Sequence, residues 1–192
     1  MESGLFYHVY NHANGDENLF RQDENYHYFL KLWAKYIEPI ADTYAYCLMP
    51  NHFHALIRIK SEENMGNQTG FQNLSGFISK TFSNFFNAYA KAYNKMYERR
   101  GSLFNRPFKA KEIDSDAYLI AVITYIHRNP VHHGFCDTLE AWPHSSYHAY
   151  YSQQATKLKR QETLEWFGGV DAMEKRHALE PRIPDTSLFI DY

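Results

Sequence analysis

The sequence predicts an α/β fold of the α+β sandwich type, in which a mostly antiparallel, ferredoxin-like sheet carries packed helices. Strand-like and helix-like segments follow one another in the order β-α-β-β-α-β-α, judged from the change between two-residue and 3.6-residue apolar periods. The 192 residues are enough to bury a sizeable core. We expect one domain over residues 1–140, and a C-terminal extension over 141–192 packed on or beside it.

The first half of the chain supplies three strands and one helix. Residues 5–11 (LFYHVYN) read as the first strand, and a helix capped by Asp23 or Asn25 runs to about Glu38. Residues 40–49 and 52–60 are predicted strands, and the tight Pro50-Asn51 connection between them predicts a β-hairpin. Residues 61–72 form a polar loop.

The second half begins with a long helix over residues 74–97, whose apolar side chains recur at helical spacing. A strand near 108–113 follows. The next helix is capped by Asp114 or Ser115 and is expected to end near Asn129, because Pro130 comes next. The chain after about Phe135 is rich in Trp, Tyr and charged residues, and Gly168-Gly169 separates two short helical patterns there.

Composition narrows the class of protein. The longest apolar stretch, around residues 117–126, is far too short to span a membrane. No secretory signal is visible at the N-terminus, and two cysteines give neither a disulfide framework nor a CxxC zinc pair. We therefore expect a reduced, cytoplasmic protein. Residues 71–135 are basic while both flanks are acidic, an asymmetry that favours a polyanionic partner.

The triplet His52-Phe53-His54 is the first candidate site. Alternate side chains on a strand share a face, so the two imidazoles lie roughly 6–7 Å apart along the strand and point the same way. Two such imidazoles can bind one metal ion. Phe53 belongs to the other face of the strand, which we expect to be the buried one. The ordinary alternative is a pair of surface or hydrogen-bonded histidines at a strand start.

The helix that begins near residue 115 offers partners for these histidines. Tyr125 and Asn129 are spaced i, i+4, so a phenol and an amide oxygen project side by side, and Tyr118 lies on the same stripe. Asn129 could give the ion a third, oxygen ligand, and Tyr125 could act as a nucleophile beside it. The ordinary alternatives are a packing tyrosine and a helix-stop asparagine.

A basic stretch between these two motifs is the candidate phosphate-binding surface. Cations that alternate with aromatic rings, here Phe104 and Phe108, suit single-stranded nucleic acid. The cations are Lys80, Lys91, Lys95, Arg99, Arg100, Arg106, Lys109 and Lys111. The helical lysines among them are equally typical of a solvated helix face. His8, His12 and the pair His132-His133 show no ligand spacing, and we expect them to have a structural role or to hold a metal ligand in place.

Several separated motifs together resemble the single-strand DNA transposases of the HUH class, named for histidine–hydrophobic–histidine. Within that class the chain is most similar to the REP-associated tyrosine transposases. The resemblance spans most of residues 5–151 and rests on YHVYN, FRQDENYHYFLKLW, YCLMPNHFHALI, GSLFNRPFKA, YIHRNPVHHGF and WPHSSYHAY, in the expected order.

The resemblance implies an HUH endonuclease-like fold and a divalent metal, Mg²⁺ or Mn²⁺, held by His52, His54 and Asn129. It implies that Tyr125 attacks a DNA phosphate, keeps a 5′-phosphotyrosine link and releases a 3′-OH. The implied partner is single-stranded DNA with a REP-like or insertion-sequence hairpin. The C-terminal extension resembles that of monomeric members, so a monomer is favoured and a dimer remains possible.

The chain departs from the family pattern at two places. It has His132-His133 where the family often has an arginine, and YNHANG where a basic residue is common. Two other functions therefore stay open. One is a domesticated hairpin-binding protein that does not cleave, and the other is a metal phosphoesterase with a water nucleophile.

Overall fold

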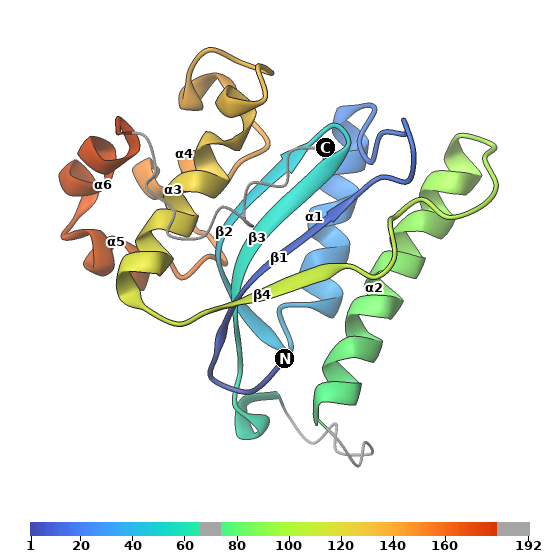
Figure 1. Cartoon of the computed structure of the whole chain (residues 1–192), viewed down its shortest axis with the longest axis horizontal. Coiled ribbons are helices and arrows are strands. Elements are labelled where there is room, and N and C mark those ends of the chain that lie inside the picture. Colours follow the sequence, from blue (N-terminus) through green and yellow to red (C-terminus); the bar gives the residue numbers. More distant parts are fainter. Residues whose placement is uncertain (66–73, 180–192) are drawn as a thin grey trace.

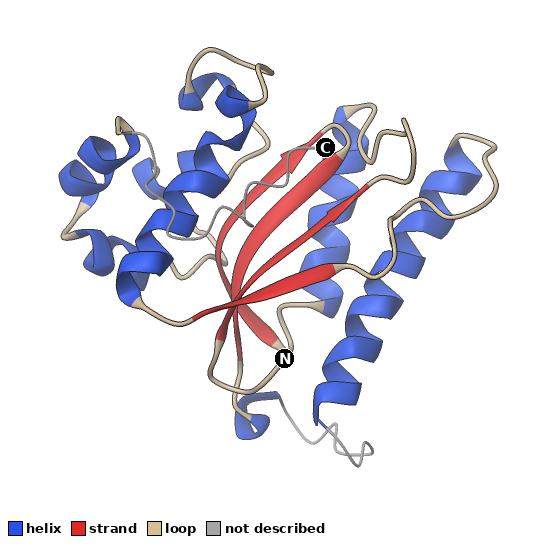
Figure 2. Cartoon of the chain, viewed as in Figure 1, coloured by secondary structure: helices blue, strands red, loops and turns tan. Residues whose placement is uncertain are grey.

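A computed structural model describes residues 1–65 and 74–179 and has the predicted order of strands and long helices (Figures 1 and 2). Its strands are β1 (Phe6–His12), β2 (Ala41–Met49), β3 (His52–Ile59) and β4 (Lys109–Ile113). Its main helices are α1 (Asp23–Tyr36), α2 (Leu74–Met96) and α3 (Asp116–His132). Shorter helices follow as α4 (Tyr147–Tyr151), α5 (Arg160–Phe167) and α6 (Val170–His177).

The four strands form one sheet in the order β2-β3-β1-β4, and every neighbouring pair is antiparallel. This is the strand order of the split βαβ, ferredoxin-like arrangement. The predicted fold class is therefore confirmed. The register places His12 opposite His52 and Tyr10 opposite His54, so β1 and β3 bring their even-numbered side chains together on one face.

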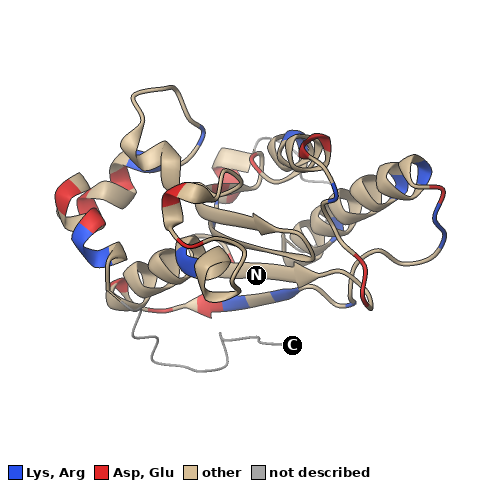
Figure 3. Ribbon diagram, turned by 90° about the horizontal axis from the view of Figure 1, so that it is seen from above, with Lys and Arg blue, Asp and Glu red and all other residues tan. Residues whose placement is uncertain are grey.

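Helices cover both faces of the sheet (Figures 1 and 3). Helices α1 and α2 bury the face that carries Phe53, Ala55 and Ile57 in one core cluster. Helix α3 packs over β2 and β3 on the other face, where Leu56 joins a second cluster. The expectation that only the Phe53 face of β3 is buried was therefore wrong, because α3 also covers the face of the two histidines.

Helix α3 does not end at Asn129 as expected but runs through Pro130 to His132. Proline lacks only its own N–H, so in the last turn it removes a single hydrogen bond, and the helix tolerates it there. The end is made instead by Gly134, whose φ of 69° is left-handed, and by the Phe135 N–H, which donates to Pro130 O over 2.8 Å. Pro130 therefore lies in the last turn of α3, and Gly134 ends the helix.

The described part of the predicted extension covers the outer edge of β2. The Leu48 N–H donates to His144 O over 2.9 Å, and the Ser146 N–H donates to Tyr46 O over 2.9 Å. Further along, the Lys159 N–H donates to Thr43 O over 3.0 Å. These bonds satisfy an edge strand that otherwise offers unpaired backbone groups. The short helix Glu62–Met65 begins the predicted 61–72 loop, and most of that loop lies outside the described residues.

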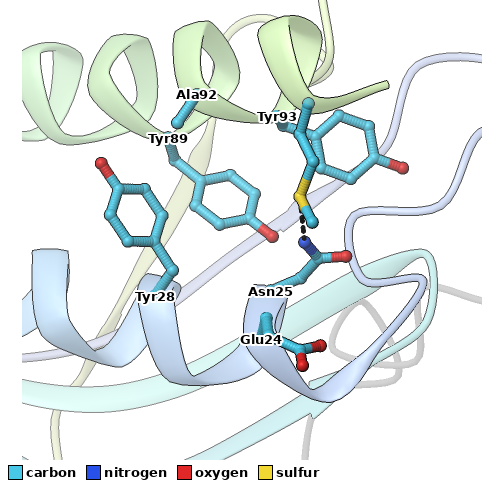
Figure 4. A pocket seen from close by; sticks show the side chains of 7 residues that line it. Glu24, Asn25, Tyr28, Tyr89, Ala92 and Tyr93 are labelled. Atoms are coloured by element: carbon cyan, nitrogen blue, oxygen red, sulfur yellow. Dashed lines mark hydrogen bonds between the residues drawn. The ribbon is translucent and has the colours of Figure 1, made fainter.

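A pocket of 310 Å³ lies between the start of α1 and the end of α2 (Figure 4). Tyr28 and Tyr89 reach it from the two helices, and Asn25 Nδ2 donates to the Met96 sulfur over 3.6 Å beside it. Its walls belong to the helical layer opposite α3, so it lies across the sheet from the histidine pair. Among the described residues, no helix is long and apolar enough to cross a membrane.

Candidate metal and tyrosine site

The structure brings the predicted histidines, tyrosine and asparagine into one cluster between β3 and α3. The Tyr125 ring centroid lies 5.6 Å from that of His54, in an edge-to-face arrangement. One helical turn later, Asn129 Oδ1 lies 3.4 Å from His52 Nε2. All four side chains are buried. A strand start and the last turns of a helix, distant in sequence, thus converge on one point.

Two residues of β1 complete the cluster. His8 Nε2 lies 2.9 Å from His54 Nδ1, and the His12 ring stacks on His52 with centroids 4.5 Å apart. The ring of His133, just beyond α3, lies 5.0 Å from that of His52. Sequence reasoning noted these histidines without finding a ligand geometry for them. The pairing of β1 with β3 places His8 and His12 beside the two histidines of β3, and it is a long-range contact that no local spacing reveals.

Burial keeps these histidines neutral. It lowers the pKa of His52 to about 3, with smaller contributions from the charges of His12 and His133. Burial, helped by the Lys111 charge, also lowers the pKa of His8 to about 3. The pKa of His54 falls well below its usual value, again mainly through burial. Neutral imidazole is the form that binds a metal ion.

The hydrogen bonds of His52 indicate where its lone pair points. Its Nδ1 lies 2.7 Å from Asn51 Oδ1, an oxygen that can only accept, so Nδ1 carries the proton. A neutral imidazole has one N–H, and the lone pair of His52 Nε2 therefore faces Asn129 Oδ1. With this tautomer and this orientation of the Asn129 amide, two acceptors face each other at 3.4 Å, and a cation between them would stabilise the arrangement. This pair of atoms fits a bound metal ion.

The same reasoning applies to His54. If its Nε2 binds the ion, its Nδ1 must carry the proton and donate to His8 Nε2. His8 then holds its own proton on Nδ1, an atom with no hydrogen-bond partner among the described residues. Two imidazoles and an amide oxygen suit Mn²⁺ better than Mg²⁺, which prefers oxygen. No group of three or more His, Cys, Asp or Glu with metal-binding geometry occurs in the described ranges. The role of Asn129 as a third ligand stays a prediction.

Tyr118, the other tyrosine on this stripe, lies elsewhere. Lys111 Nζ is 5.9 Å from its ring centroid, and the Tyr118 hydroxyl has no hydrogen-bond partner in the part of the chain that the structure describes. Of the two tyrosines, Tyr125 is the one with a ring contact to His54.

The predicted DNA-binding cations fall into separate groups. Lys109 and Lys111 of β4 pair with Tyr10 and His8, so their side chains share the sheet face of the histidine cluster. Strand β4 forms one edge of the sheet, and Figure 3 shows basic segments along a strand at the edge of the sheet. Lys80, Lys91 and Lys95 are exposed on α2, in the other helical layer.

The remaining cations lie in and after the turn that follows α2. Arg99 forms an ion pair with Glu17, Nε to Oε2 over 2.6 Å, and this pairing occupies its charge. Arg100 and Arg106 are exposed. Phe104 is buried in the core, and Phe108 packs on Phe82 with centroids 5.0 Å apart. Both rings also line a pocket of 970 Å³ together with Arg106, and their role as aromatic platforms stays a prediction.

The chain has similarity in sequence and in fold to proteins of one kind. No family model matches it. It is 27% identical over 109 residues to a Haemophilus influenzae protein named "Putative REP-associated tyrosine transposase". The match covers 56% of this chain and 59% of that relative, so the chain spans less than two thirds of the relative's length.

A solved structure of a REP-associated tyrosine transposase bound to a REP hairpin has the same fold. The TM-score is 0.59 at 17% identity, over 80% of this chain and 82% of that one. The predicted resemblance to REP-associated tyrosine transposases is confirmed. At this level of identity, the solved structure establishes the fold, and the chemistry has to be argued from the residues of this chain.

Proposed function

We propose that this protein cleaves and rejoins single-stranded DNA beside a hairpin, with Tyr125 as the covalent nucleophile. The observation that carries the proposal is the contact of Tyr125 with His54, one turn before Asn129 meets His52. A phenol next to a set of metal ligands, in the fold of a hairpin-bound transposase, supports transfer of a DNA phosphate to tyrosine.

The proposed step is a transesterification. The Tyr125 hydroxyl oxygen forms a bond to phosphorus while the bond from phosphorus to the 3′ oxygen breaks. The phenol proton is lost and the departing 3′ oxygen gains one, so the products are a 5′-phosphotyrosine and a free 3′-OH. Attack by a 3′-OH on the same phosphotyrosine reverses the step and joins strands without a nucleotide cofactor.

His52, His54 and Asn129 would hold a divalent cation, Mn²⁺ or Mg²⁺. When bound, such an ion polarises the phosphate oxygens and stabilises the negative charge of the transition state. The protein's own contribution is positional: His8 and Asn51 orient the two imidazoles, and α3 places Tyr125 beside them. Because the cluster is buried, DNA binding has to be accompanied by local opening of the site.

The sheet face beside the cluster is the proposed track for the strand. Lys109 and Lys111 provide cations there. Tyr10 lies between these lysines and His54, and the ring centroids of Tyr10 and His54 are 5.7 Å apart. The hairpin is taken from the structural relative, which was solved bound to one. We also propose that the protein is a monomer, with one domain over residues 1–140 and a C-terminal extension over residues 141–192.

The test is formation of a protein–DNA adduct. Wild type and Tyr125→Phe are incubated with 5′-labelled and 3′-labelled hairpin oligonucleotides and Mn²⁺, then separated under denaturing conditions. We expect an adduct in the wild type and in the matched control Tyr118→Phe, and none in Tyr125→Phe or with EDTA. An adduct that survives Tyr125→Phe would contradict the assignment.

The same gel separates the two other functions. A non-cleaving hairpin-binding protein gives salt-dependent binding and no adduct with any metal. A phosphoesterase with a water nucleophile gives hydrolysed product that is insensitive to Tyr125→Phe.

A further inference from the structure

A row of rings leads away from the histidine cluster, starting at His52. The ring of His133 lies 5.0 Å from His52, and the ring of Phe135 lies 6.3 Å from His133. The indole of Trp142 follows, 5.7 Å from Phe135. A chain of ring contacts, the first edge-to-face and the next two tilted, therefore connects a candidate metal ligand to a point beyond the end of α3.

The row ends in a pocket of 540 Å³ at the tip of the β2–β3 turn. Its lining includes Phe20, Arg21, Tyr26, Pro50, Phe135 and Trp142. Pro50 and Asn51 form the turn, and His52 follows directly. A group held in the pocket is therefore separated from the candidate metal ligands by one tight turn of backbone.

The walls of the pocket are fixed by hydrogen bonds and stacking. Trp142 Nε1 donates to Leu48 O over 3.0 Å, and the His144 ring stacks on Tyr26 with centroids 3.5 Å apart. The backbone of Phe135 is held by its N–H bond to Pro130 O. Phe135 nevertheless keeps 41% of its surface exposed, one of the few large apolar side chains in the described residues to do so. An exposed ring on a fixed backbone provides a ready stacking platform.

The charge of the pocket favours bases over phosphates. Arg21 is paired with Glu17 over 2.7 Å, and Asp23 lies 3.3 Å from His144 Nε2, so the lining carries both signs. A phosphate-binding surface needs an excess of cations. An aromatic platform with little net charge suits the face of a nucleobase, because every base has a π-face to stack.

We propose that this pocket holds one or two unpaired bases of the DNA strand that adjoin the cleaved phosphate, with Phe135 as the stacking ring. The proposal rests on the proposed function, since the row of rings starts at a candidate metal ligand. Its volume lies within the range of pockets that enclose small organic ligands, which leaves room for one or two bases.

The test compares hairpins with and without single-stranded tails. Binding is measured in EDTA for a blunt hairpin and for hairpins with a four-nucleotide 5′ or 3′ tail carrying 2-aminopurine at successive positions. The variants are Phe135→Ala, the aromatic replacement Phe135→Trp, and the matched control Tyr28→Ala, an exposed aromatic residue of α1 in the other helical layer.

We expect Phe135→Ala to weaken binding of one tailed hairpin at least about fivefold, the lower end of what one stacked base contributes. Binding of the blunt hairpin stays within about twofold. Quenching of 2-aminopurine at one tail position is lost in Phe135→Ala and kept in Phe135→Trp, while Tyr28→Ala behaves as wild type.

Two outcomes overturn the inference. If the wild type binds blunt and tailed hairpins equally, or if Phe135→Ala weakens both to the same degree, the pocket does not hold tail bases and the proposed function is untouched. If the wild type binds no hairpin at all, the proposed function falls and the pocket proposal falls with it.

Discussion

His8 Nε2 and His54 Nδ1 lie 2.9 Å apart across strands β1 and β3, both fully buried. Neither imidazole can hold more than one proton while it is neutral, so His54 Nε2 is free to bind a metal ion when His54 Nδ1 carries the proton and donates to His8 Nε2. The pair links the strand that sequence reasoning left without a role to the strand that carries the histidine motif.

His8→Leu is therefore expected to weaken binding of Mn²⁺ by about 10- to 100-fold, the usual effect of losing the partner of a ligating histidine. Leucine fills much of the same buried space but accepts no hydrogen bond. His8→Gln keeps an acceptor and should recover part of the affinity. Calorimetric titration of each variant with Mn²⁺ measures the effect, and wild-type affinity in His8→Leu would show that His8 does not orient His54.

Asn129→Asp should make the protein more dependent on metal. A carboxylate in place of the buried amide is costly without a cation and binds a cation more strongly than an amide oxygen does. We expect a lower melting temperature than wild type in EDTA and a larger increase on adding Mn²⁺. Thermal unfolding with and without Mn²⁺ tests this, and Asn87→Asp on the exposed side of α2 is the control. An equal Mn²⁺ response in Asn129→Asp and wild type would remove Asn129 from the ligand set.

Lys109→Ala and Lys111→Ala should each make DNA binding less dependent on salt. A lysine that contacts phosphate releases about one counterion, so the slope of log affinity against log salt becomes shallower by about 1. Lys80→Ala on α2 is the matched control, since it lies in the other helical layer. Fluorescence anisotropy between 50 and roughly 200 mM salt covers the useful range. A larger change of slope for Lys80→Ala than for the β4 variants would place the strand on α2 instead.

Stability should fall in mild acid because of a second buried histidine pair. His177 Nε2 lies 2.8 Å from His127 Nδ1, and burial lowers the pKa of His177 to about 4. The unfolded chain takes up this proton near pH 6.5 and the folded chain only near pH 4, so stability is full above about pH 6.5 and decreases below it.

Replacing His177 by Asn should remove up to one proton from this pH dependence, about 1.4 kcal/mol per pH unit between these two values. Urea unfolding at several pH values gives the slope for wild type and variant. His27→Asn, on the exposed side of α1, is the control. Identical slopes for wild type and His177→Asn would mean that His177 takes up its proton equally easily in both states.

The sequence predicted the parts of this fold that depend on local periodicity. The strands and helices, their order and the joint placement of His52 with His54 follow from two- and 3.6-residue spacing. The pair Tyr125 and Asn129 follows from the i, i+4 rule. The end of α3 was misplaced, because a proline in the last turn of a helix costs little when a left-handed glycine follows it.

Long-range contacts could not be predicted in this way. The role of His8 depends on the register of β1 against β3. The charge of Arg99 is paired with that of Glu17, a residue far away in sequence. The exposure of Phe135 depends on how the extension folds back beside β2. Each of these features is produced by tertiary packing, and no window of neighbouring residues contains it.

The central claim is that Tyr125 becomes linked to DNA. The most direct measurement is mass spectrometry of the peptide that stays attached to a hairpin oligonucleotide after reaction with Mn²⁺ and digestion of protein and DNA. We expect a nucleotide phosphate on Tyr125 that is absent when EDTA replaces the metal. A modified Tyr118, or cleaved DNA with no modified tyrosine, would contradict it.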